Sequence, residues 1–237
     1  MVQHRRNTSA MSKRTTDITV VQAHAEDAAE LFAVASEAFG TWEPAWAAFF
    51  NSHWTEKGRK LGAERYVAAM KKNDHAMYHK AVDTSTGKVV GFSIWGVFKN
   101  RNLEEISDTS PNSYWENTED AKYARTIMSN ILKRRQGFVE ACGRNAVHLN
   151  TLAVLPEYQG MGIGRKLMAW GVEQADVLGF PSWVEASVPG RPLYEKYGFV
   201  VVKDLTLNLE NFNREPFTYA WMIRPATKVA EELNGSR

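Results

Sequence analysis

A short run of glycines between two strongly patterned segments limits the fold of this chain more than any other feature. Residues 147–154 have the pattern of a strong strand, residues 162–178 repeat apolar side chains with helical spacing, and Gly160, Gly162 and Gly164 lie where the two segments meet. In a strand–turn–helix unit the backbone N–H groups of the turn and of the helix start point inward together, so an anion can bind there. Glycine removes the side chains that would keep a phosphate away. A glycine run alone is weak evidence, because a dinucleotide-binding turn or a purely structural turn could also carry it.

The order of the other elements predicts one mixed α/β domain over residues 17–225. Alternating or continuous apolar runs indicate strands, and apolar residues three and four apart indicate helices. We expect residues 98–145 to form an insertion with a long helix, and residues 1–16 and 226–237 to be tails. The expected strands are 17–22, 76–83, 89–97, 147–154, 183–186, 199–203 and 217–223, and the expected helices are 26–39, about 62–72, 119–142, 162–178 and 191–197.

Composition limits the partners and the compartment. Among 237 residues, 29 basic and 27 acidic side chains leave a formal charge of +2, which does not resemble the basic face of a nucleic-acid-binding protein. No apolar run approaches the length of a membrane span, and a single cysteine, Cys142, favours a reducing compartment. We therefore expect a cytoplasmic protein, monomeric or homodimeric. The basic stretch Met1–Thr16 would also suit a mitochondrial presequence, although we favour a solvated tail.

Two motifs in order resemble the GNAT superfamily of acyl-CoA-dependent N-acyltransferases. Gln159, Gly162 and Gly164 occupy the places of its cofactor motif, and residues 152–158 precede them as the family usually has them. The second signature is similar to residues 193–199, Leu-Tyr-Glu-Lys-Tyr-Gly-Phe. The resemblance implies an α/β fold of the α+β type: a mixed, mostly antiparallel sheet of six to seven strands, with helices on both faces and a helical insertion between strands 3 and 4.

The resemblance implies acetyl-CoA as the acyl donor and no metal. It places the backbone N–H of Leu152 against the thioester carbonyl, where negative charge develops during amine attack. Ser187 and Gly190 stand where relatives often have Asn and Ala, so the contact of Ser187 with the pantetheine arm is the least secure. The implied cofactor-binding residues are Leu152, Ala153, Val154, Gln159, Gly160, Met161, Gly162, Ile163, Gly164, Arg165, Ser187 and Tyr194.

Proton transfer needs two further groups. Tyr194 has the family's position for the acid that protonates the departing CoA thiolate, although it could also only pack the short helix. The amine arrives as an ammonium, and many relatives place a glutamate for its proton where this chain has His148, with Asn150 two residues on and thus on the same strand face. A histidine satisfied by backbone groups at a strand edge is the alternative. Glu104, Glu105 and Asp108 of the insertion are other candidates for the base.

The acceptor is less determined by the sequence. Trp42, Trp46 and Trp95 lie in regions that wall the acceptor side in the family, and aromatic walls suit a flat or cationic amine. Plain core packing is the alternative for these rings. The sequence therefore predicts transfer to a primary amine by direct attack in a ternary complex, with a small-molecule acceptor favoured over protein lysines or N-termini. A non-catalytic acetyl-CoA sensor is the alternative from another class.

Overall fold

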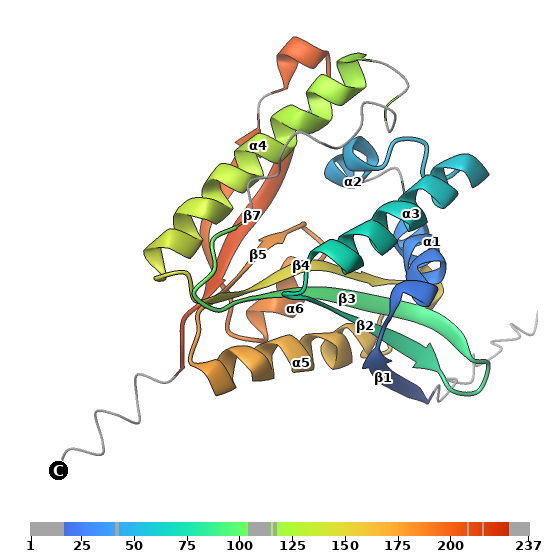
Figure 1. The fold of residues 1–237 in the computed structure, drawn as a ribbon, viewed down its shortest axis with the longest axis horizontal. Helices are drawn as coiled ribbons and strands as arrows, with labels where there is room; N and C mark the ends of the chain where they lie inside the picture. The colour runs from blue at the N-terminus through green and yellow to red at the C-terminus, as the bar shows by residue number, and fades with distance from the viewer. Residues whose placement is uncertain are drawn as a thin grey trace, which may run out of the picture.

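The computed structural model describes residues 17–40, 43–103, 115, 118–207, 209–214 and 216–227. Its centre is a seven-stranded sheet with the order β1-β2-β3-β4-β5-β7-β6, in which only β4 and β5 run parallel (Figure 1). The mixed, mostly antiparallel sheet expected from the sequence is thereby confirmed. The strands are β1 Ile18–Gln22, β2 Ala76–Asp83, β3 Lys88–Phe98, β4 Ala146–Val154, β5 Ser182–Ala186, β6 Val200–Leu207 and β7 Phe217–Arg224.

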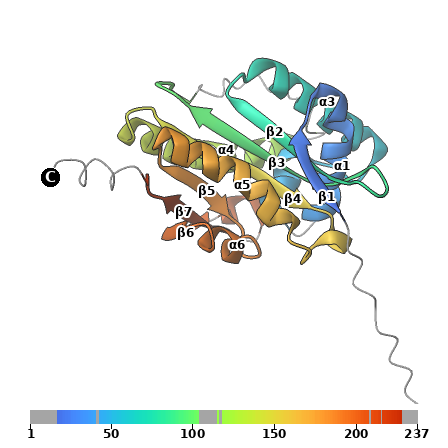
Figure 2. The ribbon, with the colours of Figure 1, turned by 90° about the horizontal axis from the view of Figure 1, so that it is seen from below.

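Helices cover both faces of the sheet (Figures 1 and 2). The helices α1–α3 pack over one half of one face and α4 over the other half, whereas α5 runs across the opposite face with α6 beside it. The α-helices are α1 Ala28–Phe39, α2 Pro44–Phe49, α3 Glu56–Lys72, α4 Thr118–Ala141, α5 Ile163–Leu178 and α6 Arg191–Glu195, and the 3-10 turns are η1 Ala25–Asp27, η3 Pro156–Tyr158 and η4 Glu210–Phe212.

The sheet opens between its two parallel strands. β4 pairs with β5 only from Val147 with Ser182 to Leu149 with Val184. Beyond this point β4 continues along β3 to Val154, and β5 continues along β7 to Ala186. The two strands diverge because each follows its own antiparallel neighbour, and the edge of β4 that faces β5 is left without a strand partner over its described C-terminal half.

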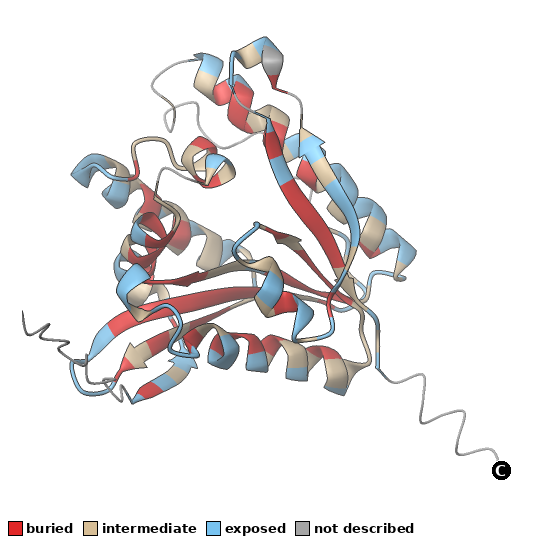
Figure 3. Cartoon of the chain, turned by 180° about the vertical axis from the view of Figure 1, so that it is seen from behind, coloured by how far each residue is buried: buried red, intermediate tan, exposed pale blue. Residues whose placement is uncertain are grey.

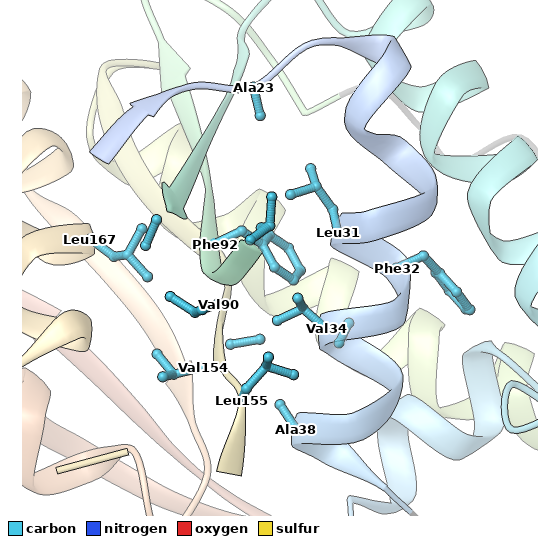
Figure 4. Close-up of a cluster of buried hydrophobic side chains, with 14 of the residues drawn as sticks. Ala23, Leu31, Phe32, Val34, Ala38, Val90, Phe92, Val154, Leu155 and Leu167 are labelled. Atoms are coloured by element: carbon cyan, nitrogen blue, oxygen red, sulfur yellow. The ribbon is translucent and has the colours of Figure 1, made fainter. Parts of the chain in front are cut away.

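A large core fixes α1 on the sheet. Figure 4 shows Leu31 and Val34 extending from one side of α1 toward Phe92 of β3 and Leu155, the residue after β4, while Phe32 extends from the other side of the helix. Each of these side chains is buried, and burying one such side chain contributes roughly 1.5–3 kcal/mol of transfer free energy. The apolar residues that recur in the sequence at helical spacing are therefore the ones that pack α1 into the core.

The central and edge strands differ in burial (Figure 3). β3 is buried along nearly its whole length, so it shows no polar alternation, whereas β6 at the sheet edge is largely exposed. Among the described residues, none of the helices combines the length and the apolar character that crossing a bilayer requires.

The main differences from the expected elements concern α2, α3 and β6, and β6 continues to Leu207 instead of ending at residue 203. α3 begins at Glu56 rather than near residue 62, because Thr55 caps it by accepting a hydrogen bond from the N–H of Gly58 at 2.9 Å. Its first two turns are polar and therefore carry no apolar period. The short helix α2 was not expected at all, and the long helix expected in the insertion is α4.

Candidate active site

A cleft of about 960 Å³ opens where β4 and β5 diverge. We divide its lining residues into two groups, which we call the glycine end and the aromatic end. The glycine end is lined by Leu152–Val154, Gln159, Gly160, Gly162–Arg165, Ser187, Gly190, Leu193 and Tyr194. The aromatic end is lined by Phe39, Glu43, Trp46, Phe49, Phe50, Arg65, Tyr66, Phe98, Ile131, Arg135, His148, Glu185, Phe217 and Tyr219.

The glycine turn presents backbone to the cleft. Gly160 and Gly162 have φ angles of 76° and 82°, which favour glycine, and a Cβ at either residue would meet nothing within 4 Å. Gly162 is the N-cap of α5, whose first N–H groups lack partners within the helix. Gln159 braces the turn by donating from Nε2 to the carbonyl of Val154 at 3.1 Å. The arrangement is an anion site of the helix-N-terminus type.

Gly164 has a different function from the other two glycines. A Cβ there would lie 3.0 Å from Cδ2 of Leu193, so the missing side chain lets α5 approach α6. Tyr197, two residues after α6, links this segment to α5 by donating its hydroxyl hydrogen to the carbonyl of Arg165 at 2.8 Å. Met161, in contrast, is 48% exposed and is not among the described residues that line the cleft.

The strand β4 carries a bulge at the start of its open edge. Ile94 pairs with Thr151 and Trp95 pairs with Leu149, so Asn150 is the extra residue on β4. Strict alternation therefore stops at Asn150, and the same-face relation of His148 and Asn150 does not follow from their spacing. Both nevertheless line the cleft, as do Leu152, Ala153 and Val154 farther along the open edge.

Tyr194 lies at the glycine end on the first turns of α6. It is buried, and its ring packs so closely on Gly190 that a Cβ there would lie 3.0 Å from Cε2 of Tyr194. Burial raises the pKa of Tyr194 above its ordinary value, so the phenol keeps its proton at neutral pH. Ser187 lines the same wall, and its carbonyl accepts hydrogen bonds from the N–H groups of Gly190 and Arg191, each at 3.1 Å.

His148 belongs to a buried network with Glu185 and Arg135. Nε2 of His148 lies 3.1 Å from Oε2 of Glu185, and Arg135 donates from Nε to Oε1 and from Nη2 to Oε2, each at 2.9 Å. The imidazole stacks on Trp183 with a centroid separation of 4.3 Å and an interplanar angle of 8°. The partner of His148 is thus a carboxylate, which the sequence did not indicate.

This network sets the charges of its members. Burial is the main cause that lowers the pKa of His148 to about 4, and the Arg135 cation adds to it while Glu185 opposes it. Burial would raise the pKa of Glu185, but Arg135 and His148 together hold it at about 2. At neutral pH we therefore take Glu185 as ionised and His148 as neutral.

Aromatic side chains from α1, α2 and α3 form one wall of the aromatic end. Trp46 lies 4.3 Å from Phe50 and 5.5 Å from Phe32 between ring centroids, and the guanidinium of Arg65 lies 4.2 Å above the ring of Phe50. Tyr66 closes this wall from α3, 5.5 Å from Phe32. Trp46 therefore both packs in the core and lines the cleft.

Trp95, the second tryptophan of the acceptor prediction, does not line the cleft with Trp46. Trp95 is fully buried on the opposite face of the sheet, where Nε1 donates to the carbonyl of Leu167 at 3.4 Å and Gly171 of α5 packs on its ring. Its assignment to the acceptor side is wrong, because neighbouring strand residues alternate between faces and Gly96 is the one on the cleft side. Trp42 lies outside the described residues, as do Glu104, Glu105 and Asp108.

Glu43 is a candidate that the sequence analysis missed. Of the described residues that line the cleft, Glu43 and Glu185 are the two with carboxylates. Glu185 is engaged by Arg135 and His148, whereas the described hydrogen bond of Glu43 comes from the N–H of Ala45 at 3.4 Å. Burial raises the pKa of Glu43. A glutamate at the N-cap position just before Pro44 is unusual, and this was the available signal.

Within the described ranges, no group of three or more His, Cys, Asp or Glu side chains is arranged to hold a metal ion. The groups of the cleft that bear on its chemistry include backbone N–H groups, the buried phenol of Tyr194, the buried neutral imidazole of His148, and the carboxylate of Glu43, which has no cationic partner among the described residues.

Residues 123–201 match the family model of the acetyltransferase (GNAT) domain. Among solved structures, a mosquito arylalkylamine N-acetyltransferase-like protein 5b aligns with a TM-score of 0.63 and 18% identity, over 88% of this chain and 99% of that chain. A histone acetyltransferase HPA2 and related acetyltransferase from Corynebacterium glutamicum aligns with a TM-score of 0.58 and 16% identity, over 90% of this chain and 98% of that chain.

A phosphinothricin acetyltransferase from Sinorhizobium meliloti, in complex with AcCoA, aligns with a TM-score of 0.52 and 18% identity, over 88% of each chain. These identities are low, so the alignments show a common fold. The acceptors in their names differ from one protein to the next.

Proposed function

Because the chain belongs to the GNAT superfamily, we propose that it transfers an acetyl group from acetyl-CoA to a primary amine by direct attack in a ternary complex. The observation that carries the proposal is the glycine end of the cleft. There the positive-φ turn at Gly160 and Gly162, the open edge of β4 and the buried phenol of Tyr194 line one wall. A backbone cradle for a pyrophosphate beside an acid suits an acyl-CoA thioester.

The proposed cofactor contacts follow the order of these residues. The pyrophosphate would bind at residues 159–164, with Arg165 nearby, and the pantetheine arm would pair with Leu152–Val154 and pass Ser187. The N–H of Leu152 would stabilise the negative charge that develops on the thioester oxygen. A relative of the same fold was solved with AcCoA bound, which supports this donor.

The reaction forms a bond from the amine nitrogen to the carbonyl carbon and breaks the bond from that carbon to sulfur. Tyr194 gives a proton to the departing CoA thiolate, and the raised pKa of Tyr194 suits a group that must stay protonated until that step. The attacking nitrogen then loses the proton that restores Tyr194. The remaining requirement is a group that deprotonates the incoming ammonium.

We assign this first proton to Glu43. An alkylammonium has a pKa of about 10.4, roughly six units above the pKa of about 4 of His148, so His148 is a poor acceptor. Glu43 is the cleft carboxylate without a cationic partner among the described residues. Burial raises the pKa of Glu43, which makes it a stronger base than an exposed glutamate. Its charge would also attract the ammonium into the aromatic end.

We favour a small-molecule acceptor with an aromatic group. The wall formed by Trp46, Phe50 and Tyr66 offers apolar ring contacts to such a molecule, and Phe217 and Tyr219 also line the cleft. An arylalkylamine N-acetyltransferase-like protein is among the proteins of this fold, which supports the same class. Protein lysines or N-termini are the second candidate, since a histone acetyltransferase shares the fold.

An acceptor panel tests the function. The purified protein is incubated with acetyl-CoA and, separately, with arylalkylamines, linear polyamines and lysine-containing peptides, and released CoA thiol is measured with a no-amine control for hydrolysis. We expect release with arylalkylamines above the other two groups. Tight acetyl-CoA binding without turnover on any amine would instead identify a sensor, and preference for the peptides would move the acceptor to proteins.

A further inference from the structure

The buried network of His148, Glu185 and Arg135 is not used by the proton transfers assigned above. Its three side chains come from β4, β5 and α4, and they meet next to the last paired residues of β4 and β5, where the cleft begins. All three line the cleft, and their side chains are only 4%, 10% and 15% exposed. Stability alone does not explain the network, because buried ion pairs are often no more stabilising than apolar packing.

The geometry fixes which nitrogen of His148 carries its hydrogen. Glu185 is held ionised by the two hydrogen bonds from Arg135, and a carboxylate accepts hydrogen bonds but cannot donate them. Nε2 of His148 must therefore carry the hydrogen that points to Oε2 of Glu185. In a neutral imidazole the other nitrogen, Nδ1, then has a lone pair and no hydrogen.

The lone pair on Nδ1 opens onto the cleft. The described partners of His148 are Glu185 through Nε2 and Trp183 through the ring face, so Nδ1 has no hydrogen-bond partner among the described residues. Nδ1 is nevertheless absent from the described polar atoms that are both unpartnered and closed off from solvent. Because His148 lines the cleft, a molecule there can reach Nδ1.

We propose that Arg135 and Glu185 are positioning residues, which hold His148 with a bare Nδ1 that accepts a hydrogen bond from the attacking amine. The inference rests on the proposed acetyl transfer and deepens it. Once Glu43 has removed the first proton, the amine has two N–H groups and one lone pair. A hydrogen bond from one N–H to Nδ1 turns the lone pair toward the thioester, and such orientation is a large part of the advantage of a bound reactant.

The ring cannot easily turn away from this orientation. Trp183 is fully buried between Phe98 and Phe138, with centroid separations of 5.7 Å and 5.2 Å, and its indole fixes the plane of the imidazole. Glu185 then fixes the rotation within that plane. The charged and titratable groups around His148 are Glu185 from β5, Arg135 from α4 and His75 before β2.

Two substitutions of His148 separate orientation from structure. In His148→Gln the side-chain amide nitrogen can reach the place of Nε2 and still donate to Glu185, but nothing replaces Nδ1. In His148→Asn the shorter amide can supply an acceptor oxygen near the place of Nδ1, but Glu185 loses a donor. We expect His148→Gln to keep the melting temperature and the acetyl-CoA affinity and to lose about 10- to 100-fold in kcat. His148→Asn should be less stable and yet keep more kcat than His148→Gln.

Three outcomes would overturn the proposal. Wild-type kcat in His148→Gln would remove Nδ1 from the reaction. If His148→Asn had both a lower melting temperature and a lower kcat than His148→Gln, activity would simply follow stability. The network would then have a purely structural role. A changed pH dependence of kcat/KM between about pH 6 and 9 in His148→Gln would make His148 a titrating base. A hydrogen-bond acceptor that stays neutral over this range contributes no pH dependence.

The tautomer can be measured without any activity. Nitrogen chemical shifts of ¹⁵N-histidine-labelled protein distinguish Nε2–H, Nδ1–H and imidazolium forms, and His148 is the signal that disappears in His148→Gln. We expect the Nε2–H form at pH 7, and a loss of its dominance in Glu185→Gln. An imidazolium or an Nδ1–H form in the wild type would refute the proposal. If no amine is acetylated at all, the proposed function fails while this tautomer readout stands by itself.

Discussion

The glycine end and the aromatic end of the cleft are built in different ways. The glycine end comes from two short stretches of chain, residues 152–165 and 187–194, and it presents mainly backbone groups. The aromatic end collects side chains from α2, α3, α4 and β7, which lie far apart in the sequence. Backbone recognition of an anion needs only local turn geometry, whereas side-chain recognition needs the whole fold to converge.

Charge is also handled differently at the two ends. At the glycine end the cations Arg165 and Lys196 are exposed, where salt screens them. At the aromatic end Glu185 and Arg135 are buried and neutralise each other, and Glu43 is the carboxylate left without a described cationic partner. The first end can attract a multiply charged ligand from a distance, and the second can select one cation at short range.

A negative charge at the turn should abolish cofactor binding at the glycine end only. In Gly162→Asp a carboxylate at positive φ would face the proposed pyrophosphate site, and two like charges about 4 Å apart repel by about 4 kcal/mol at an effective dielectric constant of 20. We expect the dissociation constant for acetyl-CoA to rise about 1000-fold by calorimetry. Gly162→Asn is the matched control, with similar backbone strain but no charge. Equal losses in both variants would show that backbone geometry, not charge, governs the site.

Glu43→Gln should damage the aromatic end without affecting the glycine end. The amide still accepts the hydrogen bond from Ala45 but cannot take the ammonium proton, so we expect kcat/KM for the amine to fall about 100-fold. In the wild type, kcat/KM should rise with pH as Glu43 loses its proton. This rising limb of the pH–rate profile should be absent in the variant. An unchanged limb with unchanged acetyl-CoA affinity would exclude Glu43 as the base.

The same substitution should raise stability. Because the folded-state pKa of Glu43 is raised, the folded state holds the Glu43 proton more tightly than the unfolded state does, and its contribution to stability is lost as pH rises through the folded pKa. Glu43→Gln removes this loss, so its melting temperature at pH 7–8 should equal or exceed that of the wild type. A melting temperature well below wild type would make Glu43 a structural cap instead.

The difference between the two ends also explains what the sequence could predict. Gln159, Gly162, Gly164 and Tyr194 were assigned because two short motifs resemble those of the GNAT superfamily, and in the structure all four residues line the cleft. The seven strands were expected because each shows its own pattern. The role of each residue in binding or catalysis stays a prediction until it is measured.

The aromatic end could not be predicted because its pattern is not local. Trp46 and Trp95 look alike in the sequence, but one lines the cleft and the other lies under α5. The pairing of His148 with Glu185 depends on the register of β4 and β5, and the approach of Arg135 depends on how α4 crosses the sheet. Glu43 immediately precedes α2, a helix of six residues that is too short for a period to be recognised.

Tyr194→Phe should separate chemistry from binding at the glycine end. The ring still packs on Gly190 and Phe199, so stability and acetyl-CoA affinity should stay close to wild type. Loss of the acid should lower kcat about 10- to 100-fold. A thioester with a more acidic thiol needs less help in leaving, so the loss should shrink with such an analogue. A kcat within about twofold of wild type would leave Tyr194 only a packing role.

The smallest effect should come from Trp46→Phe, which trims one ring of the aromatic wall. We expect KM for an arylalkylamine to rise about 3- to 10-fold, because one extra or missing apolar group in a pocket changes binding by about 1–3 kcal/mol at most, while KM for acetyl-CoA stays the same.

Trp95→Phe is the matched control, since Trp95 is fully buried beneath α5. It should lower the free energy of unfolding by about 1–3 kcal/mol through a cavity and leave the ratio of KM values for aromatic and aliphatic amines unchanged. If Trp95→Phe changed that ratio and Trp46→Phe did not, the acceptor would not bind at the aromatic end. The acceptor site would then have to lie on another surface of the protein.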